Sequence, residues 1–317
     1  MTIRPTGEPG SFPTDPGEGV VASDDRLTAK YRRLQASYRE HVLGVAEWGE
    51  GVGGRLIPSM LPEAAQSGLN FLNGHASAHA EERITEVPKE RGSLAPDRLR
   101  RNMLSSMPLC FNIFGALRDA PGFPRMLEAA FDIHIDIVER VVCEWVPPRA
   151  GTDDRDLLGD RSAFDAAVLY AAPDGRRCLL GIETKYTEPF SQVVYDKPSY
   201  RSVHDACGWF TADCDSLLTR PTNQLFRTVL LAAAAEASAG FDEVRVGVLT
   251  LAEDKKAETV VSTVRSSLRD PTKVVHVSHE RLRDIAASSE DPAVAEWALQ
   301  FGLRYLDSDQ LSGDPGA

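Results

Sequence analysis

Residues 163–187, AFDAAVLYAAPDGRRCLLGIETKYT, are the stretch that decides the fold, because two apolar runs are joined there by a short polar turn. The Pro-Asp-Gly sequence at 173–175 is typical of a turn, since proline presets φ, aspartate bonds its own backbone and glycine tolerates positive φ. The β-branched and aromatic residues on either side favour strands. The sequence therefore predicts an antiparallel hairpin with arms 163–172 and 176–187.

The turn also predicts which residues face each other across the hairpin. With a three-residue loop, antiparallel pairing keeps the sum of partner numbers constant and places Asp165 opposite Glu183. Side chains alternate between the two faces of a strand, so Glu183 and Lys185 share one face, which Asp165 joins as a cross-strand neighbour. A register shifted by one residue would place Asp165 opposite Thr184, and the sequence leaves that alternative open.

Two facing carboxylates repel each other, so a positive group is expected near Asp165 and Glu183. Lys185 is one candidate. A divalent cation is another, because carboxylate oxygens suit Mg²⁺ or Mn²⁺, and Mg²⁺ usually takes one or two carboxylates while keeping waters for the substrate. A charged strand face without a catalytic function is the alternative interpretation of the same residues.

Asp165, followed eighteen positions later by Glu183-Thr184-Lys185, resembles the motif of the PD-(D/E)xK superfamily of restriction-endonuclease-like nucleases. In that family a helix precedes a three-stranded antiparallel meander, and a helix and a fourth strand follow it. The resemblance covers the middle of the chain and extends to an uncharacterised bacterial subgroup with an E-x-K-Y-x-E run. The proline of the motif is absent, since Phe164 precedes Asp165, and the literal Pro173-Asp174 pair lies in the turn.

The resemblance implies hydrolysis of DNA phosphodiester bonds, of the restriction or defence type, with Mg²⁺ or Mn²⁺ as cofactor. Asp165 and Glu183 would hold the ion, and Glu144 is a candidate third acidic ligand. Lys185 would orient the attacking water, help to lower its pKa or neutralise the phosphate. Gln224, on the helix after the hairpin, would join the catalytic group. The alternatives are a catalytically degenerate module that binds DNA or assembles, and a nuclease that acts on RNA.

Substrate contacts are expected after the hairpin. Arg227 follows Gln224 at i, i+3 on one helix face, where the family often points polar residues at the phosphate; ordinary exposed helix polarity is the alternative. Tyr186 is a second expected contact, in a segment whose further candidates are Tyr195, Lys197 and Tyr200. The densest basic cluster, Arg98, Arg100 and Arg101, suits either phosphate binding or a solvated helix face.

The composition supports a globular, intracellular chain. Its 317 residues are 42% hydrophobic and 26% charged, which suits a sizeable core. The net charge of −12 counts against an extended DNA-wrapping surface, although a local basic cleft for DNA is compatible with it. The five cysteines include no CxxC pair, which favours a reducing cytoplasm, and no apolar stretch suits a membrane. A homodimer is compatible with a restriction-type enzyme, since such enzymes often pair to cut both strands.

The pattern along the chain predicts an α/β fold: a restriction endonuclease-like core, with a mixed central sheet that contains the hairpin and is flanked by helices, plus an N-terminal helical extension. We expect a disordered tail at 1–22, a helical region at 23–123 and the nuclease-like domain at 124–317. The predicted elements outside the hairpin are a helix from residue 23 to about 49 or 51, helix 124–132, strand 137–146, a helix from 222 that closes at 240, strand 243–251, helix 256–269, strand 273–277 and helices 279–287 and 292–306.

Overall fold

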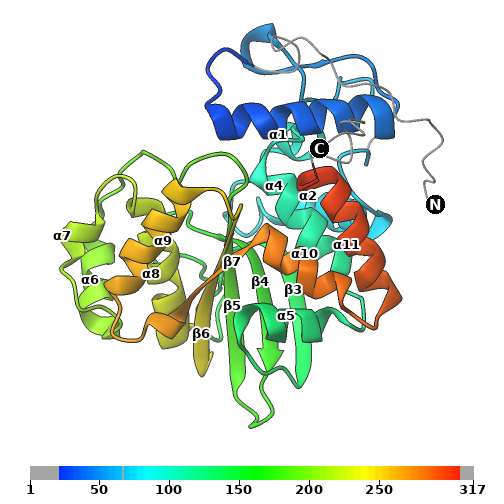
Figure 1. The fold of residues 1–317 in the computed structure, drawn as a ribbon. Helices are drawn as coiled ribbons and strands as arrows, with labels where there is room; N and C mark the ends of the chain where they lie inside the picture. Colours follow the sequence, from blue (N-terminus) through cyan, green and yellow to red (C-terminus); the bar gives the residue numbers. More distant parts are fainter. Residues whose placement is uncertain (1–20, 66–67, 308–317) are drawn as a thin grey trace.

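A five-stranded mixed sheet forms the centre of the molecule in the computed structural model, which describes residues 21–65 and 68–307 (Figure 1). Its strands lie in chain order: β3 (Ile137–Trp145), β4 (Phe164–Ala171), β5 (Arg177–Thr184), β6 (Glu243–Thr250) and β7 (Val274–Ser278). β3, β4 and β5 pair antiparallel, whereas β5, β6 and β7 pair parallel. The predicted mixed α/β core is confirmed. Residues 1–20 of the predicted tail lie outside the part of the chain that the structure describes.

The register of the β4–β5 hairpin is the predicted one. Ala166 pairs with Ile182, and Ala171 pairs with Arg177 at the turn end. Continued by one residue, this pairing places Asp165 opposite Glu183. The turn needs its glycine, because Gly175 has φ of +83°, a conformation that side chains with a Cβ rarely adopt. Because all observed β4–β5 pairs follow this register, the shifted register that would place Asp165 opposite Thr184 is excluded.

Eleven helices are present in the described residues. Their bounds are α1 (Arg26–Ser37), α2 (Gly74–Glu86), α3 (Pro96–Arg101), α4 (Ser106–Cys110), α5 (Phe123–Phe131), α6 (Pro198–Cys207), α7 (Cys214–Leu217), α8 (Asn223–Ser238), α9 (Lys255–Ser266), α10 (His279–Ala287) and α11 (Pro292–Tyr305). Short π-helical turns, Tyr38–Val42 and Phe111–Gly115, continue α1 and α4, and 3₁₀ turns occupy Val52–Gly54 and Pro271–Lys273. A small second sheet pairs β1 (Gly49–Glu50) with β2 (Leu56–Ile57). No described helix has the length and apolarity that a membrane span requires.

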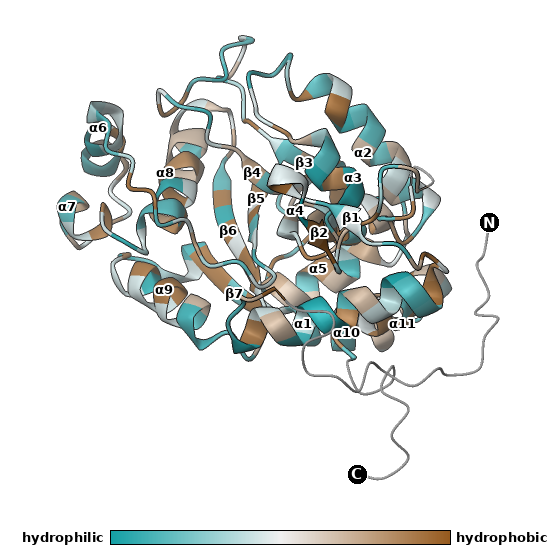
Figure 2. Cartoon of the chain, turned by 90° about the horizontal axis from the view of Figure 1, so that it is seen from above, coloured by the Kyte–Doolittle hydropathy of each residue, from teal (hydrophilic) through white to brown (hydrophobic). Residues whose placement is uncertain are grey.

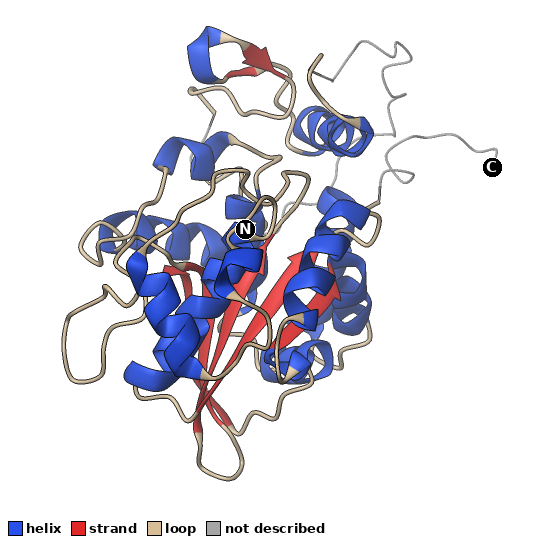
Figure 3. Ribbon diagram, turned by 90° about the vertical axis from the view of Figure 1, so that its left-hand side faces the viewer, coloured by secondary structure: helices blue, strands red, loops and turns tan. Residues whose placement is uncertain are grey.

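Helices cover both faces of the central sheet (Figure 3). On one face, α8 and α9 bury their apolar side chains against Ala167 and Leu179. On the other face, α5, α10 and α11 pack with Ala166 and Leu180, in a core cluster that also takes side chains from α1, α2 and α4. In Figure 2, hydrophobic and hydrophilic residues alternate along α9 and α11, as expected for helices with one buried side. The division at residue 123 stays a prediction.

Two differences from the predicted elements have local causes. The first helix ends earlier than expected: its π-helical turn is capped by Leu43, and Gly44 follows with φ of +67°, which stops the helix well before Gly49. The segment after the hairpin contains α6 and α7, which the sequence did not predict. α6 places only Tyr200 in the core, so its apolar pattern is too sparse to stand out from a loop.

Candidate active site

The predicted acidic residues come together at one edge of the sheet. Asp165 lies at the start of β4, Glu183 near the end of β5 and Glu144 near the end of β3. Since adjacent strands run in opposite directions there, the start of one strand meets the ends of its two neighbours. Lys185 follows β5 directly. The three strands thus bring three carboxylates and one ammonium group to the same edge of the sheet.

Glu183 is held by three side chains. Its Oε1 accepts hydrogen bonds from Gln224 Nε2 at 2.6 Å and pairs with Lys185 Nζ at 2.8 Å, and its Oε2 accepts from Thr228 Oγ1 at 2.9 Å. Gln224 and Thr228 are four residues apart on α8, so they project from the same helix face toward β5. The carboxylate, only 3% exposed, is therefore fixed in orientation. Gln224 thus contacts the predicted site, while its catalytic role stays a prediction, and Thr228 is a contact that the sequence did not predict.

Lys185 is buried, and its backbone is held from two sides. Its N–H donates to Leu249 O of β6 at 2.8 Å, and its carbonyl oxygen lies 2.8 Å from Nε2 of His279. Burial lowers the pKa of His279 to about 4, so the ring is neutral at pH 7 and donates this hydrogen bond. Burial also opposes the charge of Lys185, but Glu183 and Asp165 outweigh it and raise the lysine pKa above its ordinary value. Lys185 is thus a cation at neutral pH.

Asp165 contacts the backbone of Thr184, the residue between Glu183 and Lys185. Its Oδ2 accepts a hydrogen bond from the N–H of Thr184 at 2.6 Å. Burial and the charge of Glu183 nevertheless raise the pKa of Asp165 to about 7, although Lys185 and this hydrogen bond oppose the rise. A carboxyl with such a pKa is only partly ionised at neutral pH unless a further positive charge is supplied.

Glu144 occupies a strained position beside Asp165. Its φ is +51°, in the left-handed region that a non-glycine residue adopts only where the surrounding structure holds it. The buried Arg83 of α2 provides that hold, because it donates to the carbonyl oxygens of Cys143 at 2.8 Å and of Glu144 at 3.0 Å. Burial and the charge of Asp165 raise the pKa of Glu144 well above its usual range. Strain and suppressed ionisation in one residue are typical of functional sites.

Glu188 joins the cluster in a way that strand alternation did not predict. β5 ends at Thr184, so the chain turns and brings Glu188 back toward Asp165, whose pKa it raises further. Glu188 Oε1 accepts from the N–H of Ser106 at 3.0 Å and lies 3.7 Å from Nη2 of Arg98. Its Oε2 is buried and has no hydrogen-bond partner among the described residues. Glu188 ends the E-x-K-Y-x-E run, but strand alternation places it on the face opposite Glu183, so the sequence predicted at most a supporting role for it.

The charges of this acidic cluster do not balance. Glu144, Asp165, Glu183 and Glu188 meet two cations, Lys185 and Arg98, which leaves a formal charge of −2 when all six groups are ionised. Burial and this excess of negative charge together raise the pKa values of Glu144 and Asp165. A divalent cation would offset the excess, and Glu188 Oε2 offers it an unpaired oxygen.

The donor set fits Mg²⁺ or Mn²⁺ better than a tightly caged metal. Within residues 21–65 and 68–307, no three His, Cys, Asp or Glu side chains are arranged around one point. Mg²⁺ needs only one or two carboxylates, because it retains several waters. Oxygen donors without sulfur or imidazole also suit a hard cation. The residues present thus fit a partly hydrated divalent ion.

The two predicted substrate contacts have different surroundings. Arg227 donates to Ser162 Oγ at 2.7 Å, lies 3.3 Å from Asp160 and stacks on the ring of Tyr195 at 4.6 Å. Tyr186 is fully buried, and its hydroxyl donates to Tyr305 O at 2.9 Å. Because the Tyr186 side chain is buried in the core, a substrate cannot reach it. The predicted substrate contact at Tyr186 is therefore wrong, and the residue has a packing role.

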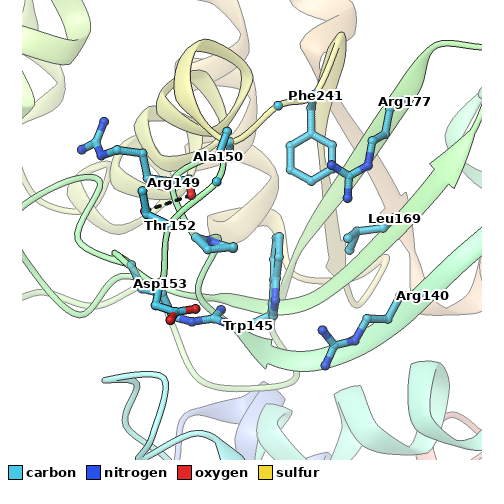
Figure 4. A pocket seen from close by; sticks show the side chains of 14 residues that line it. Arg140, Trp145, Arg149, Ala150, Thr152, Asp153, Leu169, Arg177 and Phe241 are labelled. Atoms are coloured by element: carbon cyan, nitrogen blue, oxygen red, sulfur yellow. Dashed lines mark hydrogen bonds between the residues drawn. The ribbon is translucent and has the colours of Figure 1, made fainter.

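A cavity of about 490 Å³ lies apart from the acidic cluster (Figure 4). Arg140, Trp145, Leu169, Arg177 and Phe241 are among the residues that line it. Figure 4 shows the rings of Trp145 and Phe241 beside the two arginine side chains. None of Glu144, Asp165, Glu183 and Glu188 lines this cavity, so it is separate from the candidate active site.

Comparison with known proteins agrees with this geometry. No curated protein and no solved structure gives a significant match to the chain. A family model described as the PD-(D/E)XK nuclease superfamily matches residues 22–307, which include every strand of the central sheet and every residue of the acidic cluster. With a match over most of its length, the chain belongs to the PD-(D/E)XK nuclease superfamily.

Proposed function

We propose that this protein is a nuclease that hydrolyses DNA phosphodiester bonds with Mg²⁺ or Mn²⁺. The observation that carries the proposal is the convergence of Asp165, Glu183 and Lys185, which share hydrogen bonds or charge contacts at one edge of the sheet. Family membership supports the nuclease activity. Four statements go beyond nuclease activity and stay predictions: the DNA substrate, the restriction or defence role, a homodimeric assembly and a cytoplasmic location.

Asp165 and Glu183 are the side chains that would hold the ion, with Glu144 or Glu188 as a further acid. When bound there, the ion supplies Lewis-acid stabilisation of the phosphate and an acidified water. Gln224 and Thr228 keep the Glu183 carboxylate in one orientation, which an ion-binding ligand requires. The repulsion among these carboxylates, which contributes with burial to the raised pKa values of Asp165 and Glu144, favours binding of a cation that relieves it.

Lys185 contributes a fixed positive charge. The sequence left three roles open for it: orienting the water, lowering the pKa of the water and neutralising the phosphate. Because its own pKa is raised, Lys185 holds its proton at neutral pH and does not act as a general base. Its Nζ donates to Glu183 and carries further hydrogens for a water or a phosphate oxygen. We therefore assign it to orientation and charge stabilisation.

Cleavage assays with purified protein test this proposal. Duplex DNA, single-stranded DNA and RNA are each incubated with Mg²⁺, with Mn²⁺ and with EDTA. DNA should be cut with either metal and left intact with EDTA, and faster cutting of RNA would favour the alternative substrate. Lys185→Met should lower the rate by about 100-fold or more.

A matched control comes from a second E-x-K pattern at Glu253 and Lys255. Lys255 is exposed at the start of α9 and pairs only with Glu258 among the described residues, so Lys255→Met should cut like the parent. Equal cutting by Lys185→Met and the parent would overturn the assignment.

A catalytically degenerate module remains the second candidate, because Phe164 replaces the proline of the motif and no three-ligand group is preformed in the described part of the chain. Titration calorimetry with Mg²⁺ and Mn²⁺ distinguishes the two functions. Heat of binding that is lost in Asp165→Asn supports the nuclease, whereas a folded parent protein that binds neither ion supports the degenerate module.

A further inference from the structure

The loop that follows the acidic cluster exposes three consecutive apolar side chains. We call residues 189–197 the apolar loop. In it, Val193, Val194 and Tyr195 are 53%, 41% and 47% exposed. Single apolar residues on a surface are ordinary, but a contiguous group indicates contact with another molecule. The acidic residue of the loop, Asp196, is paired with Arg201 and leaves the group free of an uncompensated negative charge.

Side chains of α8 hold the loop in place. Asn223 forms two hydrogen bonds with the backbone of Tyr195, accepting from its N–H at 3.0 Å and donating to its carbonyl oxygen at 2.9 Å. Arg227 lies under the Tyr195 ring at 4.6 Å. Gln224 Oε1 accepts from the N–H of Ser191 at 2.6 Å. The apolar side chains are therefore presented to solvent on an anchored backbone.

The same glutamine joins the loop to the acidic cluster. Gln224 accepts from Ser191 with its oxygen and donates to Glu183 Oε1 with its nitrogen, at 2.6 Å in each case. Val193 lies only two residues beyond Ser191, a span of about 7 Å of extended chain at most. The loop backbone and the Glu183 carboxylate are thus separated by a single side-chain amide, so a molecule bound on the loop lies close to the acidic cluster.

Two unpaired arginines flank the loop. Arg161 and Arg220 are exposed, and neither has a hydrogen bond or ion pair within the described part of the chain. Arg161 lies between Asp160 and Ser162, the two residues that contact Arg227 beneath Tyr195. Arg220 precedes Asn223 by three residues. Free guanidinium groups beside an apolar surface complement a ligand that has phosphates beside apolar faces.

We infer that the apolar loop contacts the faces of unstacked nucleobases, while Arg161 and Arg220 bind the neighbouring phosphates. Valine side chains have no hydrogen-bond donor for a phosphate, but valine and the tyrosine ring pack on base faces, which are open only where a strand is unpaired or is opened by an inserted side chain. The inference rests on the proposed function and narrows its substrate to DNA with unpaired bases, in preference to an intact duplex.

Fluorescence anisotropy on three DNAs of equal length tests this inference: a single strand, a duplex, and a duplex with a central unpaired segment. The full chain carrying Lys185→Met, which keeps DNA uncut, is compared with the same chain carrying Val193→Ser, Val194→Ser and Tyr195→Ser. We expect the loop variant to bind the single strand and the interrupted duplex about 10-fold to 100-fold more weakly, as loss of base stacking implies. The intact duplex should change less.

Leu299→Ser is the matched control, because Leu299 is 69% exposed on α11, outside the loop and the acidic cluster. It should leave binding of all three DNAs unchanged, and thermal unfolding should show that both variants are folded. Equal binding by the parent and the loop variant would overturn the inference. A loop variant that keeps its DNA affinity but loses self-association in sedimentation would overturn it too, since the loop would then be a protein interface.

Failure of the inference differs from failure of the proposed function. If the wild-type chain cuts DNA, and the three loop substitutions change neither DNA binding in the Lys185→Met chain nor cutting in the otherwise wild-type chain, the loop inference is wrong and the nuclease stands. If no metal supports cutting but the loop variant loses affinity for unpaired DNA, the loop inference stands and the catalytic proposal is wrong.

Discussion

Asp165→Asn tests the charge imbalance of the acidic cluster. The asparagine is isosteric, and its oxygen still accepts the hydrogen bond from Thr184 N–H, so the change removes one negative charge and little else. The pKa of Asp165 is about 7 in the folded chain against an ordinary value of 3.8. Its folded pKa is raised, so it favours the folded state fully below pH 3.8, and that stabilisation is lost as the pH rises through 7.

The size of the effect follows from the same two pKa values. A difference of about 3 pKa units corresponds to roughly 4 kcal/mol in total, of which about 2–3 kcal/mol falls between pH 5 and pH 8. Asp165 is partly exposed, so solvent screening makes these figures upper bounds. For a chain of 317 residues, 2–3 kcal/mol corresponds to about 3–5 °C in Tm.

Thermal unfolding at pH 5 and pH 8, without metal, measures the effect in wild type and Asp165→Asn. Wild type should lose stability relative to the variant as the pH rises. The buried neutral His279 has the opposite pH dependence, since its pKa is lowered to about 4, but it is present in both chains and cancels in the difference. Saturating Mg²⁺ at pH 8 should raise the Tm of wild type more than that of the variant. Parallel pH profiles for the two chains would refute the charge argument.

Three further substitutions probe the supports of the cluster. Gln224→Ala removes one hydrogen bond to Glu183 and should lower kcat about 10-fold to 100-fold in steady-state cleavage assays; an unchanged kcat would show that Thr228 and Lys185 suffice. His279→Leu leaves the carbonyl of Lys185 unpaired and should lower the free energy of unfolding in urea by about 1–3 kcal/mol. An unchanged free energy of unfolding would argue against the hydrogen bond between His279 and Lys185. Glu188→Gln removes a free carboxylate oxygen and should weaken Mg²⁺ binding in calorimetry; equal affinity would exclude Glu188 as a ligand.

The hairpin shows how far the sequence alone leads. The turn at 173–175 and the alternation of apolar residues predicted the register that places Asp165 opposite Glu183. These features act over a few neighbouring residues, where backbone preferences and the two-residue period of a strand are decisive. The strands along the chain and the helix from residue 222 were predicted from the same local patterns.

Tertiary structure decided everything that depends on distant segments. The hold of Gln224 and Thr228 on Glu183 exists because α8 packs over β5, and His279 reaches Lys185 from 94 residues away. Glu188 returns to the cluster because β5 ends before it, so strand alternation no longer applies. Tyr186, expected at the substrate, is instead buried by α1 and α11. Local sequence determines how a segment pairs with its neighbour, whereas burial and charge at a site depend on which distant elements pack there.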